Sequence, residues 1–366
     1  MNKSKSIFAC CMIMSLLGCS SLPQVNTLQG KWILEKDGST MLNPQTSGLV
    51  MKDGVLYSVS DASADESQIK RLHMIDPNSA RVINKSEGMA FDEFVKNSCF
   101  YSYLAGEPDY EALVPDPYLD DAWIWVTEDA SRGEPLSGEC QRQYGDSNST
   151  TYPTLLVRLV QEGDALRVIG VRPLQFDTHD GLADLPNDGI EGLALTKDKK
   201  LLLGLEKDGA GQPRVFSVTL SSDFFDSLLF ARVKDAGLKL PTFDSGSHPI
   251  NGMDVFYRSN GDGYLVAAAR NDNELWIIDL QKQKETVIVP LEFFAPSNTS
   301  QNCAAFHLMD NASLEGVAIA DGTIYLVNDP WKENYHKNLV CPQDKTAYDR
   351  FSPLLFQLAI DDAWFN

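Results

Sequence analysis

The feature that most constrains this 366-residue chain is a motif that recurs five times along it. Each copy begins with a polar residue, Gly and apolar residues, continues through a short apolar strand, and ends at a turn that carries an acidic residue. The clearest copy runs from Glu191 and Gly192 through Leu201–Leu205 to Asp208. The residues that open the five copies are Ser47, Glu87, Glu191, Asn251 and Glu315.

Two more strands follow most copies, in runs rich in β-branched and aromatic residues between Gly, Asp and Asn turns. The last copy has only one further strand, and the segment Gly30–Lys36 supplies the missing one from the chain start. Four-stranded units repeated in a ring form a β-propeller, which protects its sheet edges. We therefore predict an all-β fold, a five-bladed β-propeller in which the N-terminal strand closes the last blade.

The second copy leaves the number of blades open between five and six. The interval from Glu87 to Glu191 is 104 residues, which is long enough to hide a sixth blade. Five blades are favoured because residues 92–121 and 131–152 are rich in Pro, Gly, Asp and Ser, and these segments are predicted as loops.

The N-terminus has the order of features found in a secretory signal. Lys3 and Lys5 precede an apolar run, Ile7–Leu17, that is too short to span a bilayer. Its end, Leu-Leu-Gly before Cys19, resembles the lipobox of bacterial lipoproteins, in which this Cys is acylated. We expect residues 1–18 to be a cleaved signal peptide, 19–29 a lipidated Cys with a short tether, and 30–366 a single propeller domain. The resemblance implies a protein anchored by lipid to the outer membrane, on its periplasmic or its surface side.

Charge and cysteine content narrow the partners and the compartment. The formal net charge of −20 argues against nucleic acid, and contact with the membrane is expected only through the lipid. After cleavage and acylation four Cys remain, an even number that favours disulfides in an oxidising compartment. Chain order suggests Cys99–Cys140 and Cys303–Cys341, whereas the rival zinc site lacks a CxxC pair. We expect a monomer.

The residues that open the five copies predict a metal site. The first strand of each blade lines the central channel, so these residues would form a ring at one mouth. Three carboxylates that point at one axis repel one another, and a hard cation with oxygen ligands relieves the repulsion. We therefore expect calcium bound by Glu87, Glu191 and Glu315, with Asn251 and Ser47 assisting. The alternative is that each polar residue makes a hydrogen bond that fixes the start of its strand.

Long loops at the same mouth carry candidate catalytic residues, because loops on one face of a rigid scaffold often hold function. The chain has no nucleophile elbow, no HExxH motif and no phosphate-binding loop. The candidates are therefore individual residues suited to acid–base chemistry or to holding a substrate anion. They are Asp61, Asp329, His179, His336, Arg270 and Arg350.

The five motifs in this order resemble the esterase-like phytase family of bacterial β-propellers. The clearest stretches are Asn187–Leu195 and Leu314–Ala318 with Tyr325–Asp329, and the resemblance extends over roughly Gly30 to Ile360. This resemblance implies hydrolysis of a phosphate ester or a carboxylic ester.

A looser likeness to calcium-activated nucleotidases implies an axial calcium. The ligands that this likeness implies are Ser47, Glu87, Glu191 and Glu315. Asn251 stands where that pattern has Ser, and the acidic and basic pair of that family is only half present, because Asp61 is followed by no Arg.

Two functions remain open from the sequence. The first is a calcium-dependent hydrolase of a small phosphorylated substrate, in which calcium neutralises phosphate charge and activates water. The second is a non-catalytic lipoprotein whose loops bind an envelope protein or a polysaccharide, with a structural calcium on the axis.

Overall fold

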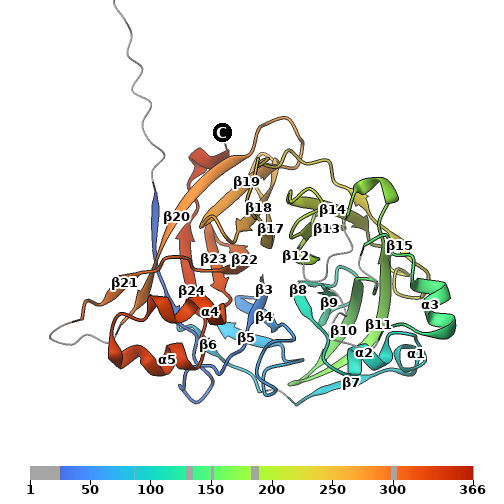
Figure 1. The fold of residues 1–366 in the computed structure, drawn as a ribbon, viewed down its shortest axis with the longest axis horizontal. Coiled ribbons are helices and arrows are strands. Elements are labelled where there is room, and N and C mark those ends of the chain that lie inside the picture. Colours follow the sequence, from blue (N-terminus) through green and yellow to red (C-terminus); the bar gives the residue numbers. More distant parts are fainter. Residues whose placement is uncertain are drawn as a thin grey trace, which may run out of the picture.

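The structure is a computed structural model, and it describes residues 25–85, 87–128, 135–149, 152–182, 189–297 and 303–365. Five antiparallel sheets stand around one axis, with their first strands β3, β8, β12, β17 and β22 at the centre of the view (Figure 1). The prediction of a five-bladed β-propeller is confirmed. The predicted signal peptide and the predicted lipidation site Cys19 lie outside the described residues. Within the described ranges, no helix is long and apolar enough to cross a membrane.

Blades one, three and five are four-stranded sheets. Blade one consists of β3 (Thr46–Lys52), β4 (Val55–Ser60), β5 (His73–Asp76) and β6 (Arg81–Val82). Blade three consists of β12 (Ile190–Leu195), β13 (Lys200–Leu205), β14 (Arg214–Thr219) and β16 (Lys234–Asp235). Blade five consists of β22 (Leu314–Ala320), β23 (Thr323–Asn328), β24 (Leu354–Ala359) and the N-terminal β2 (Lys31–Trp32).

Blades two and four each gain extra strands at the outer edge. Blade two consists of β8 (Tyr110–Pro115), β9 (Ala122–Thr127), β10 (Leu155–Glu162) and β11 (Ala165–Gln175). Its β11 also pairs in parallel with β7 (Met89–Phe91) and β15 (Ala231–Arg232). Blade four consists of β17 (Ile250–Tyr257), β18 (Gly263–Ala269), β19 (Glu274–Asp279) and β20 (Val287–Pro296), and β21 (Phe306–Leu308) pairs with β20.

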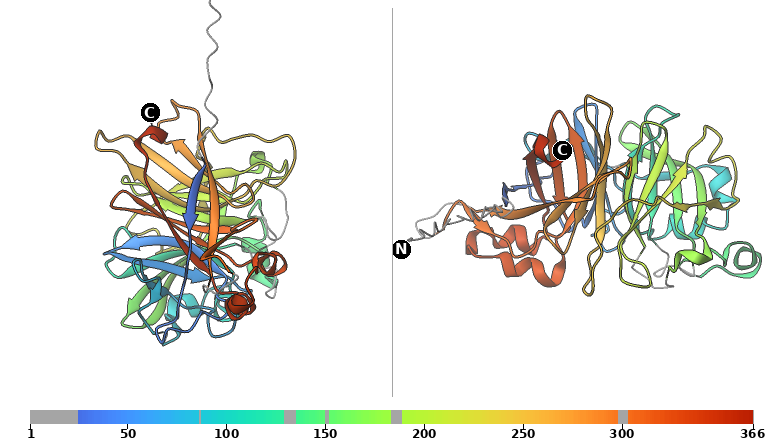
Figure 2. Two further views of the ribbon diagram at one scale, coloured as in Figure 1. Left: turned by 90° about the vertical axis from the view of Figure 1, so that its left-hand side faces the viewer. Right: turned by 90° about the horizontal axis from the view of Figure 1, so that it is seen from above.

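The N-terminal segment closes the ring, as predicted, and it also adds a strand to blade four. Strand β2 pairs antiparallel with β24 and completes blade five. Strand β1 (Asn26–Gln29) pairs in parallel with β20 of blade four, where it lies against the orange strand (Figure 2). Asn26–Gln29, which were predicted to belong to a tether, are therefore part of the propeller.

The first strand of blade two was predicted in the wrong place. Residues 92–121 are not a loop, because they form α1 (Glu93–Lys96), α2 (Tyr101–Ala105) and β8. Strand β8 occupies the axial position that had been given to the segment after Glu87. That segment forms β7, whose short apolar run suits an edge position beside β11.

The apolar character of the middle strands follows from their position between blades. All seven residues of β18 are buried, because neighbouring blades cover both of its faces. Aromatic pairs connect adjacent blades, as in the edge-on contact of Phe293 with Phe356, whose ring centroids are 4.9 Å apart. These contacts hold the five sheets as one body around the axis.

Short helices lie in the connections between the strands. They are α3 (Gly138–Tyr144), α4 (Lys332–Tyr335) and α5 (Lys345–Asp349), with single 3-10 turns at Thr178–Asp180, His336–Asn338, Pro342–Asp344 and Asp362–Phe365. Both predicted disulfides are confirmed. Cys99–Cys140 ties the segment between α1 and α2 to α3, and Cys303–Cys341 ties the segment before β21 to the turn after α4.

Candidate functional site

Each inner strand has an irregular register at its first residues, where a polar side chain lies. In four blades the partner register skips one residue, as between Ile190 and Gly192, which leaves Glu191 in a β-bulge. In blade one the shift follows Ser47. The five residues at these positions, which we call the axial ring, are Ser47, Glu111, Glu191, Asn251 and Glu315.

Small residues follow the axial ring because the inner strands nearly touch there. A Cβ atom built on Gly252 would lie 2.9 Å from Gly316 Cα, and one built on Gly48 would lie 2.8 Å from Ala112 Cα. Any larger side chain would push the strands apart. Gly, or Ala in blade two, therefore allows the inner strands to approach one another at the axis.

Four of the ring residues line an open cavity of about 490 Å³, which we call the axial cavity. Eight carboxyl-bearing side chains line it among the described residues: Asp61, Asp109, Glu111, Glu128, Glu191, Glu206, Glu315 and Asp329. Its only cationic lining residues in the described part of the chain are Arg270 and Lys332. The cavity therefore has a large excess of acidic groups.

Arg270 compensates one side of the cavity. Its Nη1 lies 2.7 Å from Glu315 Oε1, its Nη2 lies 3.1 Å from Asp329 Oδ2, and its Nε donates to Ser313 Oγ at 3.1 Å. Burial lowers the pKa of Arg270, but the nearby carboxylates, led by Glu315 and Asp329, outweigh burial and raise it, so the guanidinium stays charged. Glu315 Oε2 and Asp329 Oδ1 are buried and have no hydrogen-bond partner within the described structure.

Within the described residues, the other two ring acids, Glu111 and Glu191, form no ion pair of this kind. Burial is the main cause that raises the pKa of Glu111 and of Glu191 well above the usual range, and neighbouring carboxylates add to it. The nearest acids differ, because Glu111 is repelled most by Glu191, whereas Glu191 is repelled most by Glu128. Without a cation, protons have to neutralise this side of the cavity.

Asp61 also lines the axial cavity, on the side of Asp329. Its Oδ1 accepts hydrogen bonds from Ser63 N at 2.5 Å and Ser63 Oγ at 2.8 Å, which fix the carboxyl group. Burial, followed by repulsion from Asp329 and Asp109, raises the pKa of Asp61 to about 7. Asp109 in turn accepts a hydrogen bond from Ala62 N at 2.8 Å.

The predicted metal ligands are only partly brought together. Ser47, Glu191 and Glu315 line the axial cavity, and Asn251 occupies its ring position but is fully buried. The prediction for Glu87 is wrong, because this residue is exposed and precedes the edge strand β7.

Glu111 takes the ring position that had been given to Glu87, and the sequence held a signal for it. Glu111-Ala112-Leu113-Val114 repeats the acid, small and apolar pattern with Ala in place of Gly. With Glu111 in the series, the intervals between ring residues become 64, 80, 60 and 64 residues, far more even than before.

Three of the six catalytic candidates, Asp61, Asp329 and Arg270, line the axial cavity. The other three lie elsewhere, each with its own partner. His179 is exposed beside Asp177, His336 pairs with Asp349 at 3.3 Å, and Arg350 Nε donates to Thr40 O at 2.9 Å. We predicted all six residues at one mouth of the channel because their loops share a face of the propeller. The sequence does not show which of these loops bring their side chains close to the axis.

The cavity contains two sets of carboxylates that fit a divalent cation. Within each set of three, the ligand oxygens lie within 4.8 Å of one another. The sets are Asp109, Glu111 and Glu128, and Glu128, Glu191 and Glu206. Such all-oxygen donors suit calcium or magnesium rather than zinc, so the cluster fits the predicted class of cation, with a different ligand set.

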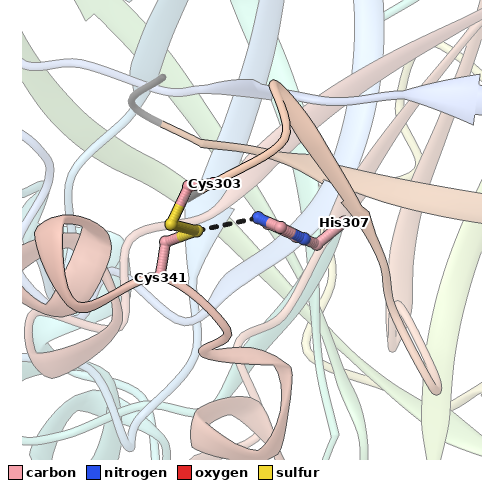
Figure 3. A group of neighbouring side chains, drawn as sticks. All are labelled: Cys303, His307 and Cys341. Carbon is pink, nitrogen blue, oxygen red and sulfur yellow. Dashed lines mark hydrogen bonds between the residues drawn. A yellow bond between two sulfur atoms is a disulfide. The ribbon is translucent and has the colours of Figure 1, made fainter. Parts of the chain in front are cut away.

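A further group, Cys303, His307 and Cys341, is not a metal site in this oxidation state (Figure 3). Its two sulfur atoms form a disulfide, and His307 Nε2 lies 2.9 Å from Cys341 Sγ. The sulfur atoms are therefore engaged with each other, and the imidazole is their neighbour.

Neither a protein-family model nor a curated protein sequence matches this chain. Similar solved structures include a β-1,3-galactosidase of glycoside hydrolase family 43 with galactodeoxynojirimycin, 11% identical over 92% of this chain and 96% of that one, with a TM-score of 0.46. Others are an exo-β-1,3-galactanase from Clostridium thermocellum (10% identical, 91% and 62% covered, TM-score 0.45) and a Cellvibrio cellulosa α-L-arabinanase (9%, 89% and 94%, TM-score 0.40).

At these levels the likeness concerns the fold alone. The predicted resemblance to esterase-like phytases and calcium-activated nucleotidases is wrong, because no family model matches and the similar structures are named as glycoside-acting enzymes. The chain is a five-bladed propeller with an acidic axial cavity.

Proposed function

We propose that this chain is a divalent-cation-dependent hydrolase that cleaves glycosidic bonds of uncharged saccharides in the axial cavity. The observation that carries the proposal is the concentration of eight carboxyl groups around one cavity, against Arg270 and Lys332 alone among the described lining residues. Carboxyl groups are the usual acids, bases and nucleophiles of glycoside hydrolysis. They are also the ligands that hard cations prefer.

The same charge balance disfavours a phosphate ester as substrate. Even with two divalent cations bound, the eight carboxylates would outnumber the positive charges of the cations, Arg270 and Lys332. A phosphate dianion would enter against this excess, whereas a neutral saccharide would not. Calcium accepts six to eight oxygen ligands, so a site built from three carboxylates leaves positions for saccharide hydroxyl groups or water.

The side chains of the cavity divide into two functional sides. Asp109, Glu111, Glu128, Glu191 and Glu206 would hold the cation, which would orient hydroxyl groups and lower the pKa of a bound water. On the other side, the hydrogen bonds from Ser63 aim the Asp61 carboxyl, and Arg270 holds Asp329 in place.

This second side provides a pair of carboxyl groups for acid and base roles, and the rim provides a surface for binding a saccharide. Asp61 and Asp329 face the same space, Asp61 as proton donor and Asp329, which is ion-paired with Arg270, as the basic partner. Trp331 is 48% exposed at the rim and offers a flat apolar face on which a sugar ring can stack.

The test is release of reducing ends from neutral polysaccharides and of the chromophore from neutral chromogenic glycosides, with calcium and with EDTA. A chromogenic phosphomonoester is the comparison substrate. We expect calcium-dependent turnover of a glycoside, a loss of at least about a hundredfold in kcat in Asp61→Asn, and a raised KM in Trp331→Ala.

Glu87→Gln is the matched control and should keep full activity, because Glu87 is exposed and off the ring. Turnover of the phosphomonoester alone would contradict the proposed substrate class. Absence of turnover on every substrate by folded, cation-loaded protein would favour the non-catalytic binding function.

A further inference from the structure

The two carboxylate sets in the axial cavity share one member. Glu128 belongs both to the set with Asp109 and Glu111 and to the set with Glu191 and Glu206. We infer that the cavity binds a pair of divalent cations, one in each set, bridged by the Glu128 carboxylate. The inference rests on the proposed function only in taking the cavity as a cation site.

Glu128 is held in a position suited to bridging. Its Oε1 accepts a hydrogen bond from Gly189 N at 2.9 Å, and its backbone N–H donates to Asp109 O at 3.0 Å. A Cβ atom on Gly189 would lie 2.6 Å from Glu128 Cγ, so only Gly allows this backbone to approach. A carboxylate has two oxygens with about four lone-pair positions, so one carboxylate can serve two neighbouring cations.

The five acids come from two adjacent blades. Asp109 and Glu111 lie at the start of β8, Glu128 follows β9, Glu191 lies in β12 and Glu206 follows β13. Rigid strands therefore present ligands from both blades across one interface, which fixes their spacing.

Buried polar atoms without partners provide a second observation. Glu315 is 3% exposed and lines the same cavity, yet its Oε2 has no hydrogen-bond partner within the described structure. Asn251, at the ring position between Glu191 and Glu315, is fully buried, and neither atom of its amide has a partner among the described residues. Buried polar atoms are rarely left unpaired, so these atoms point to a bound ion with its waters.

Charge balance favours two cations over one. One divalent cation with Arg270 and Lys332 would balance only half of the eight carboxylates. A second cation leaves the cavity only modestly negative, which an open, hydrated mouth tolerates.

The first experiment is calorimetric titration of metal-stripped protein with calcium, joined to electron paramagnetic resonance of the protein loaded with Mn²⁺. We expect two ions per chain and an exchange-coupled manganese spectrum, because a shared carboxylate holds the ions a few ångströms apart. Two uncoupled ions, or a single ion, would overturn the bridged pair. A single ion would leave the proposed function standing, whereas no binding would contradict both.

Variants separate the two positions. Asp109→Asn and Glu206→Gln should each reduce the stoichiometry from two ions to one, since each residue belongs to one set. Glu128→Gln should abolish the coupled spectrum and weaken both ions by at least about tenfold. Glu87→Gln should bind as the unchanged protein does. Equal weakening in Glu87→Gln would show that general surface charge, and not the shared carboxylate, sets the affinity.

Discussion

Arg270 and Glu315 form an ion pair in the axial cavity, with 2.7 Å between Nη1 and Oε1, and they come from adjacent blades. Arg270 follows β18 of blade four and Glu315 lies in β22 of blade five. The pair, extended to Asp329, therefore neutralises buried charge and also joins two sheets at the axis.

Removing the guanidinium should destabilise the propeller strongly. In Arg270→Met, Glu315 and Asp329 lose their counter-charge in a buried site, which costs about 3–5 kcal/mol. Urea denaturation in EDTA measures the change. Arg167→Met is the control, because Arg167 pairs with Asp92 and Glu162 at the exposed surface, where solvent screens the charges, and its loss should change the stability far less. Equal losses in both variants would refute a special role for the axial pair.

Because the inner strands lie so close together, we expect substitutions of their small residues to change the stability of the propeller. Gly252→Ala places a methyl group 2.9 Å from Gly316 Cα, where backbone has to move, and we expect a loss of about 1–3 kcal/mol of unfolding free energy. Ala112→Gly makes the opposite change at the matching position of blade two and should cost about 1 kcal/mol or less. Thermal unfolding of the two variants decides the matter, and a neutral Gly252→Ala would show that the axis is loosely packed.

The two disulfides should differ in their ease of reduction. Cys303 is partly exposed whereas Cys341 is buried, so an external thiolate attacks Cys303 Sγ and Cys341 leaves as a thiolate. His307 Nε2, 2.9 Å from Cys341 Sγ, can donate a proton to that leaving group. We expect Cys303–Cys341 to be reduced roughly tenfold faster than Cys99–Cys140 at pH 6, by alkylation and mass spectrometry. His307→Ala should remove most of the difference, and an unchanged ratio would exclude the imidazole as the cause.

Asp254 should make the stability depend on pH. Burial raises its pKa to about 7, although Ile319 N and Val255 N donate to its carboxyl group at 2.8 and 2.7 Å. The folded state thus keeps a proton that the unfolded state loses near pH 4, so this contribution is complete below pH 4 and is lost as the pH rises to 7.

The corresponding variant isolates that contribution. Asp254→Asn keeps an acceptor oxygen and removes the titration, so it should match the unchanged protein at pH 4 and be more stable by roughly 1–3 kcal/mol at pH 8. Urea denaturation at the two pH values measures this. A constant difference between the proteins at both pH values would assign the effect to packing.

Periodicity predicted the blades because each strand carries its own apolar pattern and turn. It failed in blade two, where a disulfide-linked helical insertion separates Glu87 from the true inner strand at Tyr110. The acid that belongs to the ring, Glu111, is followed by Ala, so a search for Gly after the polar residue passes over it.

The rest of the cavity could not be predicted from the motif. Asp109, Glu128 and Glu206 lie just before or after strands, where sequence position alone does not tell a buried acid from a solvated turn. Their burial depends on which blades become neighbours, and that is a property of the closed ring. Asp61 lines the cavity whereas His179 is exposed outside it, and this difference likewise depends on tertiary contacts.

The pairing of β2 with β24 sets an order on biosynthesis. Lys31 and Trp32 are among the first residues of the domain to be made, and Leu354 and Leu355, their partners, are among the last. Blades one to four can form as the chain grows, but the fifth waits for its final strand, and with it the last wall of the cavity. The nascent domain therefore stays an open arc with an unpaired edge until β24 has been made, and that interval is when it most needs protection from aggregation.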